Sequence, residues 1–332
     1  MSRFLFLLLV GMLYVGAPTG CSQHTTVPQI TLIEPELRML PTIDFFFRDD
    51  PNVLLGSLRA AADAANAPRN GTIFVREYFS TDSTGIKEDV FLRDYNYLEH
   101  NLTGVATRGI DKLVWDPKHG VAVFGMQSGG GVYGVTTDGE MIGVVSKGYS
   151  PSFTNDGRLA VVRGRPAIPS DSARVWFDGT LYPLNYPYIR ELMVTPDGTK
   201  FIYIQVGSKA IWMQDIACPT SARIIVEQGG GFSFSPTGDR LLYENDSGFH
   251  WVSLCDCSQT GDIVLPNAAM DHDPSYLSDG VAIVFSRNLR GCDNVMINCW
   301  QSSIMYWDYR RNTEPIPITE NLETRDRAPA RR

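Results

Sequence analysis

The sequence has few of the residue patterns on which common enzyme chemistry depends. It contains 5 histidines, no Gly-x-Ser-x-Gly segment and no paired Cys-x-x-Cys segments. The absence of a Gly-x-Ser-x-Gly segment excludes the nucleophile turn of an α/β-type serine hydrolase. Cys255-Asp-Cys257 has neither the spacing nor the neighbouring histidines of a zinc site. The glycine runs at 129–131 and 229–231 lack the following helix that a phosphate site needs, so we expect turns there. We therefore expect no catalytic residues and no cofactor.

Positive charge is also scarce. The chain of 332 residues has 29 lysines and arginines against 37 aspartates and glutamates, which gives a formal net charge of −8. An acidic chain of this kind is a poor partner for nucleic acid or for an anionic lipid surface. Apolar residues make up 43% of the chain, as in an ordinary globular protein.

The N-terminal apolar run is too short to cross a membrane. One basic residue, Arg3, precedes it, and Pro18 interrupts it before the roughly 20 apolar residues of a spanning helix. Residues 1–20 are therefore predicted to be a secretory signal peptide. Gly20-Cys21-Ser22 resembles the lipobox of bacterial lipoproteins, with Pro18 where that family usually has leucine. This resemblance implies a lipidated Cys21 and, from Ser22, the periplasmic side of the outer membrane. The alternative is an ordinary cleaved signal followed by an incidental cysteine.

A turn phrase recurs along the rest of the chain. Two of its copies end in Pro-Asp-Gly198 and Ser-Pro-Thr-Gly238. The glycines that close the copies stand at 120, 157, 198, 238 and 280, which are 37, 41, 40 and 42 residues apart. An apolar strand precedes each turn, a second and nearly pure apolar strand follows it, and a third strand often carries an aromatic residue. A period near 40 residues with this strand content predicts a β-propeller.

The number of repeats indicates how the ring closes. Five repeats begin near residues 110, 149, 190, 230 and 272, and residues 72–103 form a sixth that lacks its first strand. Residues 325–332 resemble the start of a repeat and then stop. We expect this C-terminal tail to supply the missing strand, because closure removes the exposed sheet edges. The fold class predicted for residues 70–332 is therefore all-β, a six-bladed propeller closed by strands from both ends of the chain.

Residues 21–69 carry no repeat. We expect a tether from the anchor, an apolar cluster at 43–47 and a helix over 51–66, with Asp50 as its cap and Pro51 in its first turn. The helix is expected to pack on the propeller or to plug one mouth, and docking of a partner is the alternative. An apolar element beside a ring is usually buried, which favours packing.

Five cysteines follow the leader, and export would permit disulfides. Cys292 and Cys299 lie in one long loop, so a bridge between them would close a small ring. Cys218 and Cys257 each stand six residues after a strand tryptophan, so we expect them at similar heights on adjacent blades, where they could pair. Cys255 is then left over.

The turns just quoted, the apolar strands and the segment Ile211-Trp-Met-Gln-Asp215 resemble the TolB-type propeller repeat over about residues 70–332. The resemblance implies the propeller fold. TolB itself is a soluble periplasmic protein whose propeller binds a peptidoglycan-associated lipoprotein and colicins. This chain differs, because its N-terminal segment is too short for TolB's separate N-terminal domain.

Two functions remain open at this stage. The first is a non-catalytic, lipid-anchored, monomeric propeller that binds another envelope protein or a peptide. The second is a carbohydrate-active or metal-dependent enzyme, or a sugar binder, that uses the central channel. Its candidate ligands are Asp271, His272 and Asp273, because some TolB-like propeller lyases gather metal-binding histidines at the channel mouth. An aspartate at that point of the repeat can also satisfy backbone donors in a turn, which favours a structural role.

Overall fold

The computed structural model divides the chain into two units, Met1–Thr31 and Leu32–Arg332. It describes residues 38–39, 51–79, 86–94, 96, 98–104, 109–126, 131–163, 173–186, 188–263, 271–288, 302–311, 314–319 and 325–331, all within the second unit. Among these residues, no helix is both long and apolar enough to cross a membrane.

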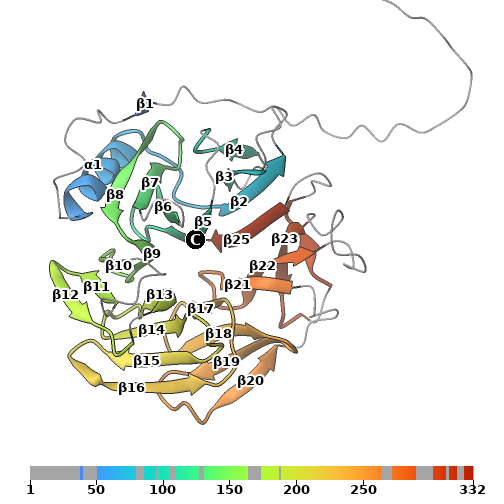
Figure 1. Cartoon of the computed structure of the whole chain (residues 1–332). Coiled ribbons are helices and arrows are strands. Elements are labelled where there is room, and N and C mark those ends of the chain that lie inside the picture. Colours follow the sequence, from blue (N-terminus) through green and yellow to red (C-terminus); the bar gives the residue numbers. More distant parts are fainter. Residues whose placement is uncertain are drawn as a thin grey trace, which may run out of the picture. The chain divides into compact units, whose positions relative to one another are not determined.

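Six blades surround a central axis in Figure 1, which confirms the predicted propeller. The first three blades in chain order are made of the following strands: β5 (Ile110–Trp115), β6 (Val121–Met126), β7 (Gly131–Thr136) and β8 (Met141–Lys147); β9 (Tyr149–Phe153), β10 (Leu159–Arg163), β11 (Arg174–Phe177) and β12 (Thr180–Pro183); β13 (Ile189–Val194), β14 (Lys200–Gln205), β15 (Ile211–Asp215) and β16 (Cys218–Val226). In each blade the first strand is innermost.

The remaining strands form three further blades: β17 (Phe232–Phe234), β18 (Arg240–Asn245), β19 (Gly248–Ser253) and β20 (Thr260–Ile263); β21 (Asp271–Tyr276), β22 (Ala282–Asn288), β23 (Ser302–Asp308) and β24 (Ile316–Pro317); β25 (Arg325–Arg331), β2 (Thr72–Phe79), β3 (Ile86–Arg93) and β4 (Glu99–Asn101). The fifth and sixth blades are linked by one parallel bridge between Ser302 and Arg325.

A separate hydrophobic cluster fills each of the six interfaces between blades. Between the third and fourth blades, for example, Ile202 and Ile211 pack with Phe232 and Leu241, all four fully or almost fully buried. The second strand of each blade lies between two such clusters, so both of its faces are covered. This position explains why the second strands are nearly pure apolar runs rather than alternating ones.

The C-terminal strand closes the ring as predicted. β25 pairs antiparallel with β2, with Arg76 opposite Asp326 and Thr72 opposite Arg331. Arg76 donates two hydrogen bonds to the Asp326 carboxylate, at 2.7 and 2.8 Å, and a third to Glu99 at 2.6 Å. The closing blade therefore joins residues 250 positions apart by a backbone ladder and by a buried ion pair.

The turn phrase owes its glycines to backbone geometry. Gly157, Gly198, Gly238 and Gly280 have φ angles of +85°, +72°, +73° and +65°, a region in which a Cβ atom is unfavourable. Gly120 is different. A Cβ atom there would lie 2.8 Å from the carbonyl oxygen of Ala67, so close packing is what requires glycine in the loosest copy of the phrase.

The N-terminal segment contributes two elements to the side of the ring. β1 (Arg38–Met39) pairs parallel with β8, and α1 (Pro51–Ala64) is the helix predicted from the sequence. Leu55 and Leu58 are fully buried against strands of the first and second blades. Arg59 bonds to Asp116 at 2.6 Å and also to the carbonyl oxygen of Gly157, so α1 ties together the turns of two adjacent blades. The apolar cluster expected at 43–47 lies outside the described residues.

Candidate functional site

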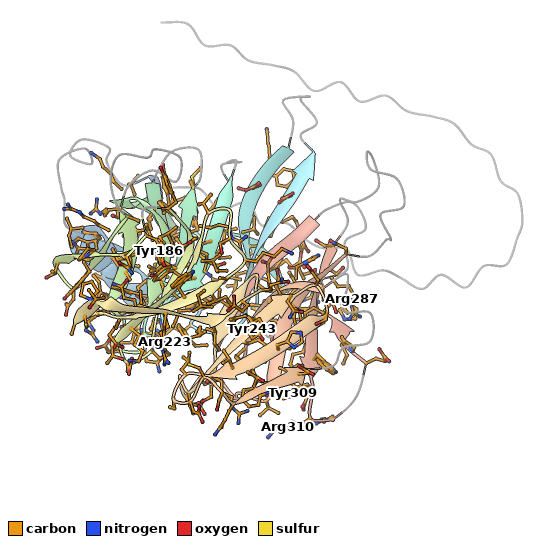
Figure 2. All side chains as sticks on the ribbon, turned by 60° about the horizontal axis from the view of Figure 1, so that its bottom comes forward. Tyr186, Arg223, Tyr243, Arg287, Tyr309 and Arg310 are labelled. Atoms are coloured by element: carbon orange, nitrogen blue, oxygen red, sulfur yellow. The ribbon has the colours of Figure 1, made fainter. Side chains whose placement is uncertain are left out.

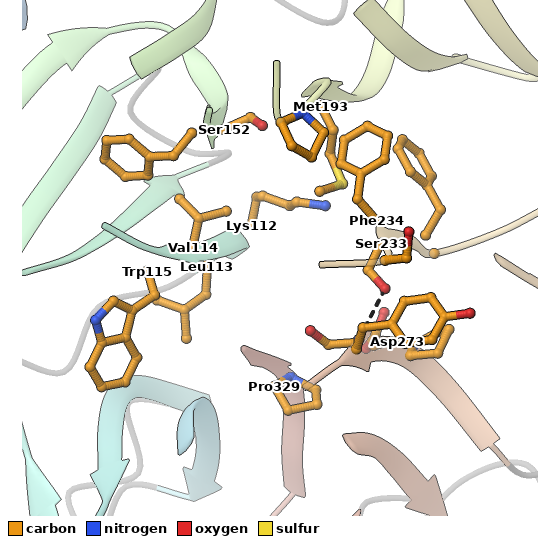
Figure 3. A pocket seen from close by; sticks show the side chains of 18 of the residues that line it. Lys112, Leu113, Val114, Trp115, Ser152, Met193, Ser233, Phe234, Asp273 and Pro329 are labelled. Atoms are coloured by element: carbon orange, nitrogen blue, oxygen red, sulfur yellow. Dashed lines mark hydrogen bonds between the residues drawn. The ribbon is translucent and has the colours of Figure 1, made fainter. Parts of the chain in front are cut away.

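The central channel holds a pocket with a volume of about 670 Å³. Residues of all six innermost strands or of the turns that follow them line it, from Lys112 on β5 to Pro329 on β25. Figure 3 shows the Lys112 side chain extending into this cavity, with Met193 and Phe234 on one side and Trp115 on the other. The volume lies within the range of about 300–1,000 Å³ that is typical of ligand sites.

Serine side chains join the innermost strands of neighbouring blades. The Ser150 hydroxyl accepts a hydrogen bond from the Leu192 amide at 2.9 Å, and that of Ser152 accepts one from the Val194 amide at 3.1 Å. The two innermost strands here, β9 and β13, belong to different sheets, so their backbone groups lack ladder partners across the gap. These hydroxyls supply the missing partners and are therefore committed to the wall of the channel.

Two charged side chains meet inside the channel. Lys112 of the first blade forms an ion pair with Glu191 of the third blade, and each side chain is about one-sixth exposed, at 16% and 17%. The Lys112 ammonium also lies 5.4 Å from the centre of the Phe232 ring. Both charged residues occupy the first position of the repeated turn phrase, which places them at the same level of the channel. Arg190, the residue before Glu191, also lines the pocket and is exposed. Within the described part of the chain it has no hydrogen bond or ion pair.

A pair of carboxylates lies on the other side of the same pocket. The Asp273 amide donates a hydrogen bond of 2.6 Å to the Glu244 carboxylate. Burial, together with the negative charge of Asp273, raises the pKa of Glu244 to about 7. A Cβ atom on Gly230 would lie 2.6 Å from a Glu244 carboxylate oxygen, so this glycine leaves room for the acid.

The three residues that the sequence suggested as metal ligands have different surroundings. Asp271 is buried and forms two hydrogen bonds with Arg287, at 2.7 and 2.8 Å, while burial raises the pKa of its carboxyl group. His272 is exposed, and Asp273 lines the channel beside Glu244. Within the described ranges, no three histidine, cysteine, aspartate or glutamate side chains are grouped so that they could hold a metal ion.

The sequence reasoning missed most of the charged residues in the channel. Lys112, Glu191 and Asp273 all fall in the first column of the aligned turn phrase, where the other copies have Ser150 and Gly231. Comparing the copies column by column would have found these three. Glu244 could have been noticed as the residue that ends an apolar second strand.

The cysteines give a mixed result. Cys218, Cys255 and Cys257 are free thiols in this structure. The Cys218 sulfur lies 3.4 Å from the Thr220 hydroxyl, and the Cys257 sulfur accepts a hydrogen bond of 3.5 Å from Arg223. The suggested Cys218–Cys257 bridge is therefore not formed here. Cys21 and the suggested Cys292–Cys299 bridge lie outside the described residues.

No family model matches this chain, and no curated protein matches it in sequence. Several solved structures match in fold. TolB from Acinetobacter baumannii superimposes with a TM-score of 0.57 at 14% identity, covering 83% of this chain and 71% of that one. A chain of the nidogen/laminin complex gives a TM-score of 0.56 at 12% identity, covering 77% and 97% of the two chains. A putative TolB from Agrobacterium tumefaciens gives 0.50 at 14% identity, with 76% and 90% covered. These likenesses establish the fold, a six-bladed TolB-like β-propeller.

Proposed function

We propose that this chain is a non-catalytic envelope lipoprotein whose propeller binds another envelope protein or a peptide through its central channel. The observation that carries the proposal is the charged channel itself. It is large enough for a peptide segment, and Arg190 stands in it without a charged partner among the described residues. Fixed charges of both signs in a partly enclosed cavity favour a polar chain with complementary groups.

Two further observations support a binding role. The hydroxyls of Ser150 and Ser152 in the channel wall already bond to backbone groups of the neighbouring strand, which gives them a structural role. One protein of similar fold was solved within the nidogen/laminin complex, which is an assembly of proteins. Because a shared fold does not determine function, this likeness supports the binding role only together with the geometry of the channel.

The location rests on the N-terminal sequence. The short apolar run and Gly20-Cys21-Ser22 support export and lipidation at Cys21, with the outer membrane as the site of anchoring. Metabolic labelling with a palmitate analogue tests this part separately. A chain that takes up label, and a Cys21→Ala variant that takes up none, is the expected result.

Site-specific photo-crosslinking tests the binding role. A photoreactive residue at Met193, which lines the channel, should yield a crosslinked adduct in intact cells. The matched control carries the same residue at Leu181, which is 50% exposed on the outer strand β12. We expect a discrete adduct from position 193, and we expect Arg190→Glu to diminish it. An adduct from position 181 alone, or none from either position, would contradict binding in the channel.

A further inference from the structure

A second pocket lies between the fourth and fifth blades, and its volume is about 260 Å³. Its lining residues come from β18, β19 and β20 of one blade and from β21, β23 and the residue after Asp308 on the next. Tyr276 separates it from the central channel, because this residue lines both cavities. The volume is slightly below the range of about 300–1,000 Å³ for drug-sized ligands, which suits a single ring better than an extended chain.

Aromatic side chains make up most of its wall. Trp307 and Tyr276 are 3% and 7% exposed. Trp251 and Tyr309 are half-buried, and Figure 2 labels Tyr309. The Trp307 and Tyr309 rings meet edge to face, with centres 6.1 Å apart. The Tyr309 hydroxyl donates a hydrogen bond of 2.9 Å to the carbonyl oxygen of Gly280, which fixes the ring. These contacts orient the Trp307 and Tyr309 rings in the absence of a ligand.

A cation lies over one of these rings. The Arg240 guanidinium is 4.2 Å from the centre of the Trp251 ring, which is cation–π distance. Within the described ranges, Arg240 has neither a hydrogen bond nor an ion pair through its side chain. Its five N–H donors are therefore available to a ligand in the pocket.

An acceptor lies in the same pocket. Asp262 is held through one carboxylate oxygen by His250, at 2.8 Å, and its side chain is 73% exposed. The other ring nitrogen of His250 lies 2.9 Å from the Asn245 side-chain oxygen and 2.9 Å from the Ser247 hydroxyl, which fixes the imidazole. No described residue bonds to the second carboxylate oxygen of Asp262. The pocket thus combines a positioned acceptor, a positioned donor and aromatic walls.

We propose that this pocket binds one neutral hexose unit of a glycan. The C–H face of a pyranose ring is apolar and packs on aromatic rings, while its hydroxyl groups donate to a carboxylate and accept from a guanidinium. An aromatic side chain of a peptide would also fill the space, but it would cover the Arg240 guanidinium and the second Asp262 oxygen without a hydrogen bond to either, and burying such groups unsatisfied is unfavourable. The sugar satisfies both charges. This inference is independent of the proposed protein-binding role of the channel.

Titration of the full chain with simple sugars tests the proposal. The probes are the methyl glycosides of glucose, galactose, mannose and N-acetylglucosamine, followed by saturation-transfer NMR and by tryptophan fluorescence. We expect saturable binding of at least one, with a Kd of about 1–10 mM for so small a ligand. Arg240→Gln and Asp262→Asn should each weaken it at least about tenfold, because each removes a charge-assisted hydrogen bond.

Two controls separate the pocket from general effects. Asp246→Asn removes an exposed carboxylate of the same blade whose one ion-pair partner among the described residues is Lys209, so it should leave sugar binding unchanged. Arg190→Glu alters the channel and should also leave it unchanged, which keeps this test distinct from that of protein binding. Circular dichroism of all variants checks that they are folded.

Three results would overturn the proposal. One is that none of the four glycosides binds up to about 100 mM, at least roughly tenfold above the expected Kd. Another is that binding occurs but survives both pocket variants. The third is that N-acetyltryptophanamide binds in their place and loses affinity in Arg240→Gln, which would assign the pocket to a peptide side chain.

Discussion

Breaking the ion pair that closes the ring should destabilise the fold strongly. Arg76 and Asp326 have side chains only 7% and 0% exposed, and they join the two ends of the chain within the closing blade. Asp326→Asn keeps the shape of the side chain but removes its charge, so the guanidinium remains buried with Glu99 as its nearest acid at 2.6 Å. Removing one member of a buried pair typically costs about 3–5 kcal/mol.

Because Glu99 remains, we expect the lower end of that range, about 3 kcal/mol in the free energy of unfolding. For a domain of this size, such a loss lowers the melting temperature by roughly 6–12 °C. The measurement is thermal unfolding by circular dichroism, with urea unfolding for the free energy. Asp156→Asn is the matched control, because it removes an exposed carboxylate paired with Arg158 and should cost less than about 1 kcal/mol.

A double variant sharpens this test. Arg76→Met combined with Asp326→Asn removes both charges, so the unpaired cation disappears. If the cost of the single change comes from that cation, the double variant should recover part of the lost stability. A melting temperature for Asp326→Asn within about 2 °C of the parent, equivalent to less than roughly 1 kcal/mol, would refute the expected cost of leaving Arg76 without this partner.

Three further predictions follow from the same structure. Deleting residues 325–332 removes β25 and exposes the edge of β2, so the truncated chain should melt far lower and aggregate; an unchanged melting temperature would mean that the ring does not depend on this strand. The pKa of Glu244 is about 7 in the folded chain against an ordinary value of 4.5, so the folded state binds the proton more tightly than the unfolded state. The free energy of unfolding should therefore fall by up to about 3 kcal/mol as the pH rises from 4.5 to above 7. Urea midpoints at pH 5 and pH 8 should show this fall in the parent but not in Glu244→Gln. Gly280→Ala should cost about 1–2 kcal/mol because its φ is +65°, while a Cβ atom there would make only ordinary contact with Pro236. Gly56→Ala in α1, with open space around it, should stabilise by about 0.5–1 kcal/mol. Urea unfolding measures both changes, and a stabilised Gly280→Ala or a destabilised Gly56→Ala would contradict this reasoning.

The architecture was accessible from the sequence because the repeat is local. The spacing of the turn glycines predicted the number of blades, and the incomplete first repeat together with the tail at 325–332 predicted the closure. Two outer strands were not predicted from the sequence. β12 is a short, mostly exposed segment, and β24 has two exposed residues. Outer strands face water on one side, so they lack the apolar runs by which the inner strands are recognised.

The candidate sites were less accessible. The sequence grouped Asp271, His272 and Asp273 because they are consecutive, but alternate residues of a strand point to opposite sides. His272 is consequently exposed, whereas Asp271 bonds to Arg287 and the backbone amide of Asp273 donates to Glu244. Pairs of residues far apart in the chain were not visible in advance, for instance Lys112 with Glu191, which span two blade interfaces.

The sequence by itself determined the repeating unit, because four of the five turn phrases need only their own few residues to fix a strand, a left-handed glycine and the next strand. It also determined that six such units form a ring that both ends of the chain complete. The tertiary structure alone decided which side chains face one another across the channel and between blades. A buried charge or an aromatic wall depends on the distances between units, and no single copy of the phrase contains that information. For this reason the closing ion pair, the acid pair beside Gly230 and the aromatic pocket of Arg240 and Trp251 appeared only once the blades were assembled.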